Sequence, residues 1–207
     1  MSGLLKIHKE NPELRKLNRI VEIIKQGGII IYPTDTLYAL GCDITNNKAI
    51  EKIAKIKGID TKKANFSFII KDLSRINDYA KPFSNRVYKL MKKNLPGPFT
   101  FILKANNSIP KMLKNNKKTI GIRIPGSNIA TDIVDLLNTP LMSSSIKNIE
   151  DGFVTYPNDP YEIFEKYKYL VDIMIDGGVG GIEPSTVIDC TGDDIEIVRQ
   201  GRGELLY

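Results

Sequence analysis

Apolar side chains recur every three or four residues in several segments of the chain, the spacing that places them on one face of an α-helix. The first segment ends at Gly27-Gly28, a pair typical of a helix C-terminus, and the second ends at Gly58. The pattern predicts helices over residues 14–24, 50–58, 73–79, 85–91, 129–137 and 161–167.

Short runs of β-branched and aromatic residues alternate with these helices and are typical of strands. The predicted strands cover residues 29–32, 66–70, 99–103, 119–124, 140–145, 171–176, 185–190 and 195–199. The last two are expected to form a hairpin around Gly192. We expect the polar, proline-containing residues 147–160 to form a surface loop, and the glycine-rich residues 177–184 a tight turn that lets two backbones approach closely. No internal repeat and no long linker interrupts the alternation, which predicts one α/β domain around a large mixed sheet.

Composition is that of a globular protein, with 42% hydrophobic and 26% charged residues among 207. No apolar run is long enough to span a bilayer, and the N-terminus does not resemble a secretory signal. We therefore expect a cytoplasmic protein with no membrane association, in which Cys42 and Cys190 are reduced thiols. Without a heptad pattern or a visible sticky edge, a monomer is the default expectation.

Several classes of chemistry are excluded by missing residues. His8 is the only histidine and lies in a polar N-terminal segment, so a Ser-His-Asp or Cys-His arrangement is not expected. Cysteine and histidine are too few for a zinc site, and no P-loop motif occurs.

A net charge of +6 suggests partners that carry phosphate. The lysines fall into three clusters, for which solvated surface and nucleic-acid contact both remain open: Lys55, Lys57, Lys62 and Lys63; Lys89, Lys92 and Lys93; Lys111, Lys114, Lys117 and Lys118.

Short segments rich in hydroxyl and basic side chains lie at the ends of predicted strands: residues 33–38, 55–58, 96–100, 121–125, 143–145, 185–187 and 199–202. Ligands bind at strand ends in α/β sheets, and hydroxyls beside Lys and Arg suit phosphates and carboxylates. These segments predict a pocket for an anionic small molecule such as a nucleotide.

The same segments resemble the YrdC/YciO family in their order along the chain. Residues 27–41 (GGIIIYPTDTLYALG) look like the family's opening signature, and a lysine-glycine pair, P-G-P-x-T, G-x-R-x-P, a serine-rich strand, S-T-V and R-x-G follow. The resemblance covers about residues 14–203, and Ser145-Ile146-Lys147 looks closest to the YciO branch. The chain is expected to be one YrdC-like domain over residues 1–207, without the C-terminal extension domain of longer members.

The resemblance implies a twisted mixed sheet with flanking helices and a concave basic groove. It implies synthesis of threonylcarbamoyl-AMP from L-threonine, bicarbonate and ATP with release of pyrophosphate, the first step of a tRNA adenosine modification. ATP is then a substrate accompanied by Mg²⁺, and tRNA and tRNA-modification proteins are possible partners. Members have also been described as binding double-stranded RNA.

Site residues carry over position by position. Lys57 would contact the phosphates and Arg123 would lie in the basic pocket, and these two are the expected catalytic residues. The threonine would be bound by Thr36, Lys104 and Ser185, and the ATP by Thr100, Ser145 and Arg199. No protein ligand for a metal is expected.

Three departures from the family pattern leave alternatives open. Ile59 stands where the family has the arginine of Lys-x-Arg, no histidine occurs near Phe68, and Lys147 replaces an asparagine, with Asn148 adjacent. The alternatives are a reaction with another amino acid or acyl donor, a non-catalytic protein that binds nucleotide or double-stranded RNA, and a scaffold subunit. The enzyme hypothesis needs Lys57 and Arg123 to converge with Arg199, and the RNA hypothesis needs the outer lysines to form one continuous stripe.

Overall fold

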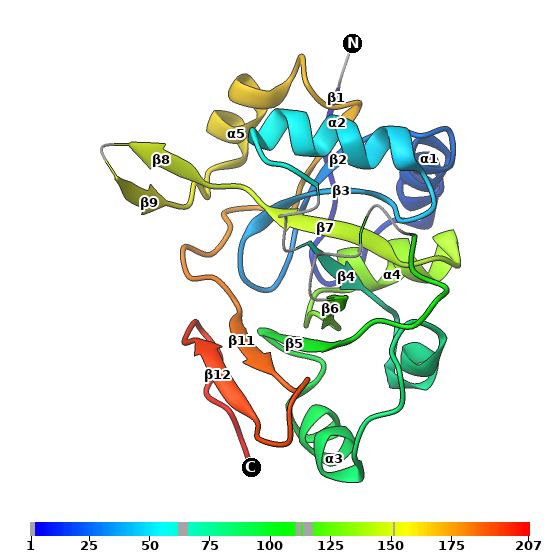
Figure 1. The fold of residues 1–207 in the computed structure, drawn as a ribbon. Helices are drawn as coiled ribbons and strands as arrows, with labels where there is room; N and C mark the ends of the chain where they lie inside the picture. The colour runs from blue at the N-terminus through cyan, green and yellow to red at the C-terminus, as the bar shows by residue number, and fades with distance from the viewer. Residues whose placement is uncertain (1–2, 62–65, 111–112, 114–117, 151) are drawn as a thin grey trace.

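A ten-stranded mixed sheet runs through the protein (Figure 1). The computed structural model describes residues 3–61, 66–110, 113, 118–150 and 152–207. In spatial order the strands are β1 (Gly3–Lys6), β10 (Ile173–Asp176), β2 (Ile30–Pro33), β3 (Tyr38–Asp43), β7 (Leu141–Ser145), β4 (Ser67–Ile69), β6 (Thr119–Arg123), β5 (Phe99–Lys104), β11 (Thr186–Asp189) and β12 (Glu196–Arg199). Parallel pairs (β1–β10, β10–β2, β4–β6 and β11–β5) alternate with antiparallel ones, which confirms the predicted α/β class with a large mixed sheet.

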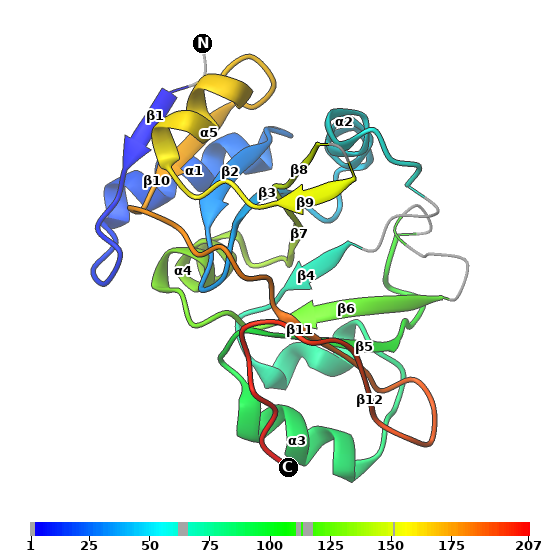
Figure 2. The same cartoon turned by 90° about the vertical axis from the view of Figure 1, so that its left-hand side faces the viewer.

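Helices cover the two faces of the sheet unequally (Figures 1 and 2). Helices α1 (Leu14–Lys25) and α4 (Asn128–Leu137) pack on one face, over β2, β3 and β10. The opposite face is covered by α2 (Asn47–Lys57), the 3₁₀ helix η1 (Leu73–Asp78), α3 (Asn85–Asn94) and α5 (Pro160–Tyr167). The sheet thus separates two hydrophobic cores, and each helix follows a segment whose apolar spacing predicted it.

Side-chain caps explain where several helices begin. Asn46 accepts a hydrogen bond from the backbone N–H of Ala49 at the start of α2, and Ser84 accepts one from Val87 at the start of α3. Helix α2 ends at Gly58, whose φ of 62° is the left-handed conformation that glycine adopts without strain.

Four strands are absent from the sequence prediction: β1, β3, β8 and β9. Strand β1 lies in the polar N-terminal segment, and β3 lies within the motif that was interpreted only as chemistry. Residues 147–160 were expected to be a loop, and that prediction is wrong: β8 (Asn148–Glu150) and β9 (Phe153–Thr155) form a protruding hairpin (Figure 1). Ile149 pairs with Val154 across this ribbon, and both side chains are exposed, so the segment lacked the buried apolar face that marks a strand.

The expected hairpin near the C-terminus is confirmed, since β11 and β12 pair antiparallel. Among the described residues, no helix is long and apolar enough to cross a membrane.

Candidate functional site

Small and polar residues line one face of the sheet where β7, β4, β6 and β5 lie side by side. Ser143 pairs with Ser67, and Ser67 pairs with Gly121 on the next strand. A Cβ on Gly121 would lie 3.0 Å from Cγ2 of Thr100, so a larger residue at this position would crowd Thr100. On the opposite face of the same strands Phe68, Phe101 and Ile122 are fully buried, whereas Ser67 and Gly121 are partly exposed. This stretch of the α1/α4 side is therefore accessible to a ligand.

Arg123, at the end of β6, is fixed by an ion pair beneath this face. Its Nη2 donates to Oδ1 of Asp35 at 2.8 Å and to Oγ1 of Thr36 at 3.1 Å. The two charged side chains are only 8% and 11% exposed. Oδ2 of Asp35 accepts from the backbone N–H of Gly126, at 3.0 Å. The Nε of Arg123 is buried and has no hydrogen-bond partner among the described residues, so this N–H remains an unused donor.

The loop that carries Asp35 and Thr36 is held by its own side chains. Oγ1 of Thr34 accepts from the backbone N–H groups of Thr36 and Leu37 and donates to the carbonyl of Leu37 at 2.8 Å. Nη1 of Arg202 donates to the carbonyl of Asp35 at 2.6 Å and ties the loop to the C-terminal segment.

The glycine-rich turn after β10 packs directly against this loop, which confirms the predicted close backbone approach. A Cβ on Gly181 would overlap the carbonyl oxygen of Thr36, and one on Gly180 would lie 2.8 Å from the ring of Tyr38. Tyr38 donates from its hydroxyl to the carbonyl of Gly178 at 2.7 Å, and burial raises the pKa of that hydroxyl to about 12. The turn is thus a supporting wall of the site.

Thr100, Ser185 and Arg199 form a second hydrogen-bonded group on the β5–β11–β12 side. Oγ1 of Thr100 and Oγ of Ser185 lie 2.8 Å apart and are both buried. Nη2 of Arg199 donates to the carbonyl of Ser185 at 2.7 Å and to its Oγ at 3.2 Å. Partial burial, with repulsion from Arg123, lowers the pKa of Arg199.

Lys57 reaches the end of β7 from the last turn of α2. Its Nζ donates to the carbonyl of Ser145, at the end of β7, at 2.5 Å. Desolvation, followed by repulsion from Lys147, lowers its pKa to about 8.

Seven of the eight predicted site residues therefore fall into three hydrogen-bonded groups: Lys57 with Ser145, Thr36 with Arg123, and Thr100 with Ser185 and Arg199. Lys104 stands apart: it is exposed at the far end of β5, four residues from Thr100, or about 13 Å along the strand. No contact recorded for its side chain joins it to Thr36 or Ser185.

The departures from the family pattern also have definite places. Ile59 is 38% exposed directly after Gly58, and no cation takes its position within the described residues of this turn. Lys62 and Lys63, considered as substitutes, lie outside the described residues. Oδ1 of Asn148 accepts from Nζ of Lys166 at 2.6 Å and so is engaged with α5.

Asp35 and Arg202 were not identified from the sequence. The sequence did contain a sign of Asp35. A carboxylate within a segment interpreted as part of an anion pocket requires a nearby cation to neutralise its charge.

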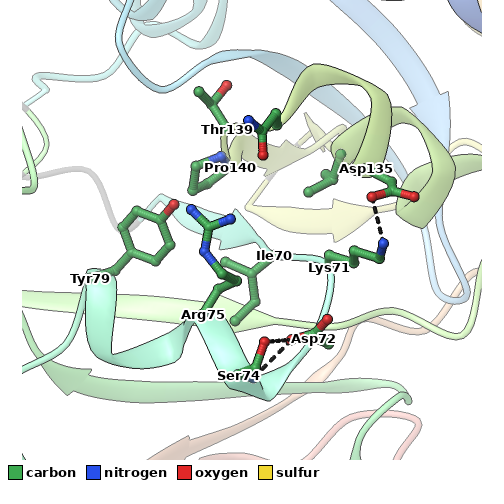
Figure 3. Close-up of a pocket in the computed structure, with 11 residues that line it drawn as sticks. Ile70, Lys71, Asp72, Ser74, Arg75, Tyr79, Asp135, Thr139 and Pro140 are labelled. Atoms are coloured by element: carbon green, nitrogen blue, oxygen red, sulfur yellow. Dashed lines mark hydrogen bonds and ion pairs between the residues drawn. The ribbon is translucent and has the colours of Figure 1, made fainter.

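A separate cavity of about 310 Å³ lies between η1 and the end of α4 (Figure 3). Its cations are already paired: Lys71 with Asp135 at 2.6 Å, and Arg75 with Asp78 at 2.5 Å. This cavity does not offer the unpaired positive charge found at the first site.

Fold and site together define a class: an α/β protein whose mixed sheet gathers cations and hydroxyls on one accessible face, as an anionic small molecule requires. Comparison with known proteins identifies the family. The model for the Sua5/YciO/YrdC family, described as "Telomere recombination", matches residues 22–201, and the chain belongs to this family.

Two relatives describe its place within the family. Protein YciO of Escherichia coli is 40% identical over 206 residues, 99% of this chain and 98% of that protein, and its crystal structure superimposes with a TM-score of 0.91. Threonylcarbamoyl-AMP synthase of Pyrococcus abyssi is 28% identical over 197 residues, 93% of this chain and 56% of that protein. The crystal structure of P. abyssi Sua5 complexed with L-threonine has the same fold, with a TM-score of 0.87 over 97% of this chain and 58% of that one, at 24% identity. The predicted membership of this family and the resemblance to YciO are confirmed.

Proposed function

We propose that this protein is an L-threonylcarbamoyl-AMP synthase, which converts L-threonine, bicarbonate and ATP into threonylcarbamoyl-AMP and pyrophosphate. The proposal is supported by the similarity to a relative named for that activity, and by the L-threonine bound in the P. abyssi Sua5 structure.

The observation that carries the proposal is the state of Arg123. Its guanidinium is held by Asp35 and Thr36 while Nε–H stays buried and unpartnered. A buried donor without a partner costs free energy, so the site gains when an oxygen ligand arrives. The carboxylate of threonine supplies such an oxygen, and the hydroxyl of Thr36 lies beside it.

The nucleotide would lie across the neighbouring strands, and we assign the expected basic groove to this face. Thr100 and Ser185 offer paired hydroxyls, and Arg199 offers positive charge at one end. Lys57 offers an ammonium group beside Ser145 at the other end. This spread of charge suits a long molecule with phosphates on one side.

The chemistry needs orientation and charge neutralisation rather than a covalent enzyme nucleophile. The neutral threonine amine adds to bicarbonate and water leaves, which forms a carbamate. A carbamate oxygen then attacks the α-phosphorus, and the bond from that phosphorus to the bridging oxygen breaks. Pyrophosphate leaves with the electron pair of the broken bond, and the ammonium group of Lys57 stabilises its negative charge.

Magnesium enters this scheme with the triphosphate. The nearest carboxylate of the site, Asp35, is engaged by Arg123 and Gly126, and no cluster of three metal-ligating side chains occurs among the described residues. Phosphate oxygens and water therefore provide the ligands, as is usual for Mg²⁺ bound to nucleotides.

Pyrophosphate release from ATP by the purified protein tests the proposal. Release should require both L-threonine and bicarbonate, and the nucleotide product should carry the mass of the threonylcarbamoyl adduct. The variant Arg123→Gln should lower the rate at least about a hundredfold. Arg75→Gln serves as the matched control, because Arg75 belongs to the separate cavity. Release that is indifferent to threonine and bicarbonate would contradict the proposal.

Binding of double-stranded RNA has less support as the main function. The lysines of α2 and those of α3 lie at opposite ends of the molecule in both views (Figures 1 and 2), so these two clusters are not neighbours in one stripe. We propose that RNA enters as tRNA, through tRNA-modification proteins that consume the adenylate in the cytoplasm.

A further inference from the structure

Charged side chains of opposite sign face the separate cavity of about 310 Å³ from two different elements (Figure 3). Arg75 comes from η1, and its guanidinium points into the cavity beside the ring of Tyr79. Asp135 comes from α4, on the other side of the cavity. The volume is at the lower end of the range found for small-molecule sites, so the ligand that fits is small.

The ion pairs at this cavity use only part of each charged group. Asp78 accepts from Nε of Arg75 at 2.5 Å, but Asp78 does not line the cavity, so the terminal amino groups of Arg75 are the part that faces it. Lys71 donates to Oδ1 of Asp135 at 2.6 Å, and no hydrogen bond to Oδ2 is recorded among the described residues. One side of the cavity therefore retains paired donors, and the other retains a carboxylate oxygen.

The charges of the described lining residues balance. Lys71 and Arg75 are positive, and Asp72 and Asp135 are negative. A polyanion such as a phosphate chain would be repelled by both carboxylates. A ligand with one charge of each sign leaves the balance unchanged and offers each side of the cavity the opposite charge.

Apolar side chains contribute to the same cavity. Ile70 and Val134 are 2% and 5% exposed, and Pro140 is buried as well. Hydrocarbon that contacts these residues is removed from water, which favours a ligand with an aliphatic part.

We propose that the separate cavity binds a small zwitterion of the ω-amino acid type, in which a short aliphatic chain joins a carboxylate to an ammonium group. Arg75 binds the carboxylate with its terminal amino groups, and Asp135 accepts a hydrogen bond from the ammonium. None of the eight residues predicted for the first site lines this cavity, so the inference does not depend on the proposed function.

Titration of the whole protein with 5-aminopentanoate, followed in amide NMR spectra, tests the inference without turnover. Binding should saturate with a Kd of about 1–10 mM, since so small a ligand makes few contacts. The shifted resonances should belong to η1, the end of α4 and the start of β7. Pentanoate and pentylamine each keep only one of the two charges, so each should bind at least about tenfold more weakly.

Two variants assign the two ends of the ligand. In Arg75→Gln the preference for 5-aminopentanoate over pentylamine should disappear, and in Asp135→Asn the preference over pentanoate should disappear. Both side chains are about half exposed, so both variants should fold. Arg86→Gln is the matched control, because Arg86 is exposed on α3 and does not line the cavity, and it should keep all three affinities.

Binding that never saturates, equal affinities for the three probes, shifts confined to other parts of the protein, or wild-type preferences in either variant would each overturn the inference. If 5-aminopentanoate binds as expected and pyrophosphate release never requires threonine, the inference stands and the proposed reaction fails.

Discussion

Asp35 and Arg123 form the ion pair with the least exposure to solvent among those recorded, and the chain positions of the two residues give no hint of it. Asp35 lies in a loop after β2, and Arg123 ends β6, 88 residues later. The pair gives the buried guanidinium of Arg123 a counter-charge, and the Nε of Arg123 stays without a partner among the described residues.

Asp35→Asn should therefore destabilise the protein by about 3 kcal/mol, because it leaves a buried guanidinium without its counter-charge. For a chain of this length the melting temperature should fall by about 6–12 °C. Asp135→Asn is the control: its pair with Lys71 is about half exposed on both sides, and its loss should cost less than about 1 kcal/mol. Equal losses in the two variants, measured by denaturant unfolding, would show that burial of the Asp35 pair is not the decisive factor.

If Lys57 binds phosphate as proposed, nucleotide binding should depend on pH. Burial lowers the pKa of Lys57 from the usual lysine value of 10.5 to about 8, so its ammonium form is complete well below pH 8 and is lost as pH rises through that value. ATP affinity, measured by calorimetry, should fall by up to about tenfold per pH unit above 8. Lys57→Arg, which stays charged throughout, should give a flat profile in the same measurement. A wild-type profile as flat as that of Lys57→Arg would refute the assignment.

At the scale of elements, the glycine-rich turn and the loop after β2 position each other. Gly177 packs on Pro33, Gly180 on Tyr38 and Gly181 on Thr36. Glycine at these three positions is thus required for the loop to place Thr36 beside Arg123.

Gly181→Ala should displace the backbone of Thr36, because the new Cβ would overlap its carbonyl oxygen. We expect KM for threonine to rise about tenfold or more and stability to fall by about 1–3 kcal/mol. The control Gly192→Ala has no atom nearer than 3.9 Å to the new Cβ and should change neither. Steady-state kinetics with threonine as the varied substrate would reveal a wild-type KM in Gly181→Ala if the turn has no positioning role.

At the scale of the molecule, the polar face lies beside the part of the sheet that α1 and α4 cover. Strands β2, β3 and β10 are packed on both faces, and on the α1/α4 side β4 buries Ile69 whereas Ser67 and Gly121 are partly exposed. A ligand there would contact strands from both halves of the chain.

Binding of ATP should consequently stabilise the whole domain. At about one hundred times its Kd, ATP should add about 2.7 kcal/mol and raise the melting temperature by about 5–10 °C. Sodium chloride at the same ionic strength is the control and should leave the midpoint nearly unchanged. A shift of the same size with the salt alone would mean that screening, not a site, is responsible.

Local patterns determined much of this protein. Apolar spacing located the helices, because a helix buries one stripe whatever it packs against, and contiguous motifs such as residues 33–38 identified the family and supplied the candidate site residues. The same patterns failed for β3, hidden in a motif, and for β8–β9, which bury no apolar face.

Only the tertiary structure decided which partner each site residue takes. Lys57 meets Ser145 and Thr100 meets Ser185 across 88 and 85 residues, through strand orders and registers that no short window of sequence contains. The physical reason is that periodicity reflects burial of a single element, whereas ion pairs and hydrogen bonds between distant segments depend on how the elements are arranged. The sequence therefore named the cations of the candidate site, and the fold determined that Arg123 is paired with Asp35 and that Lys57 meets the carbonyl of Ser145.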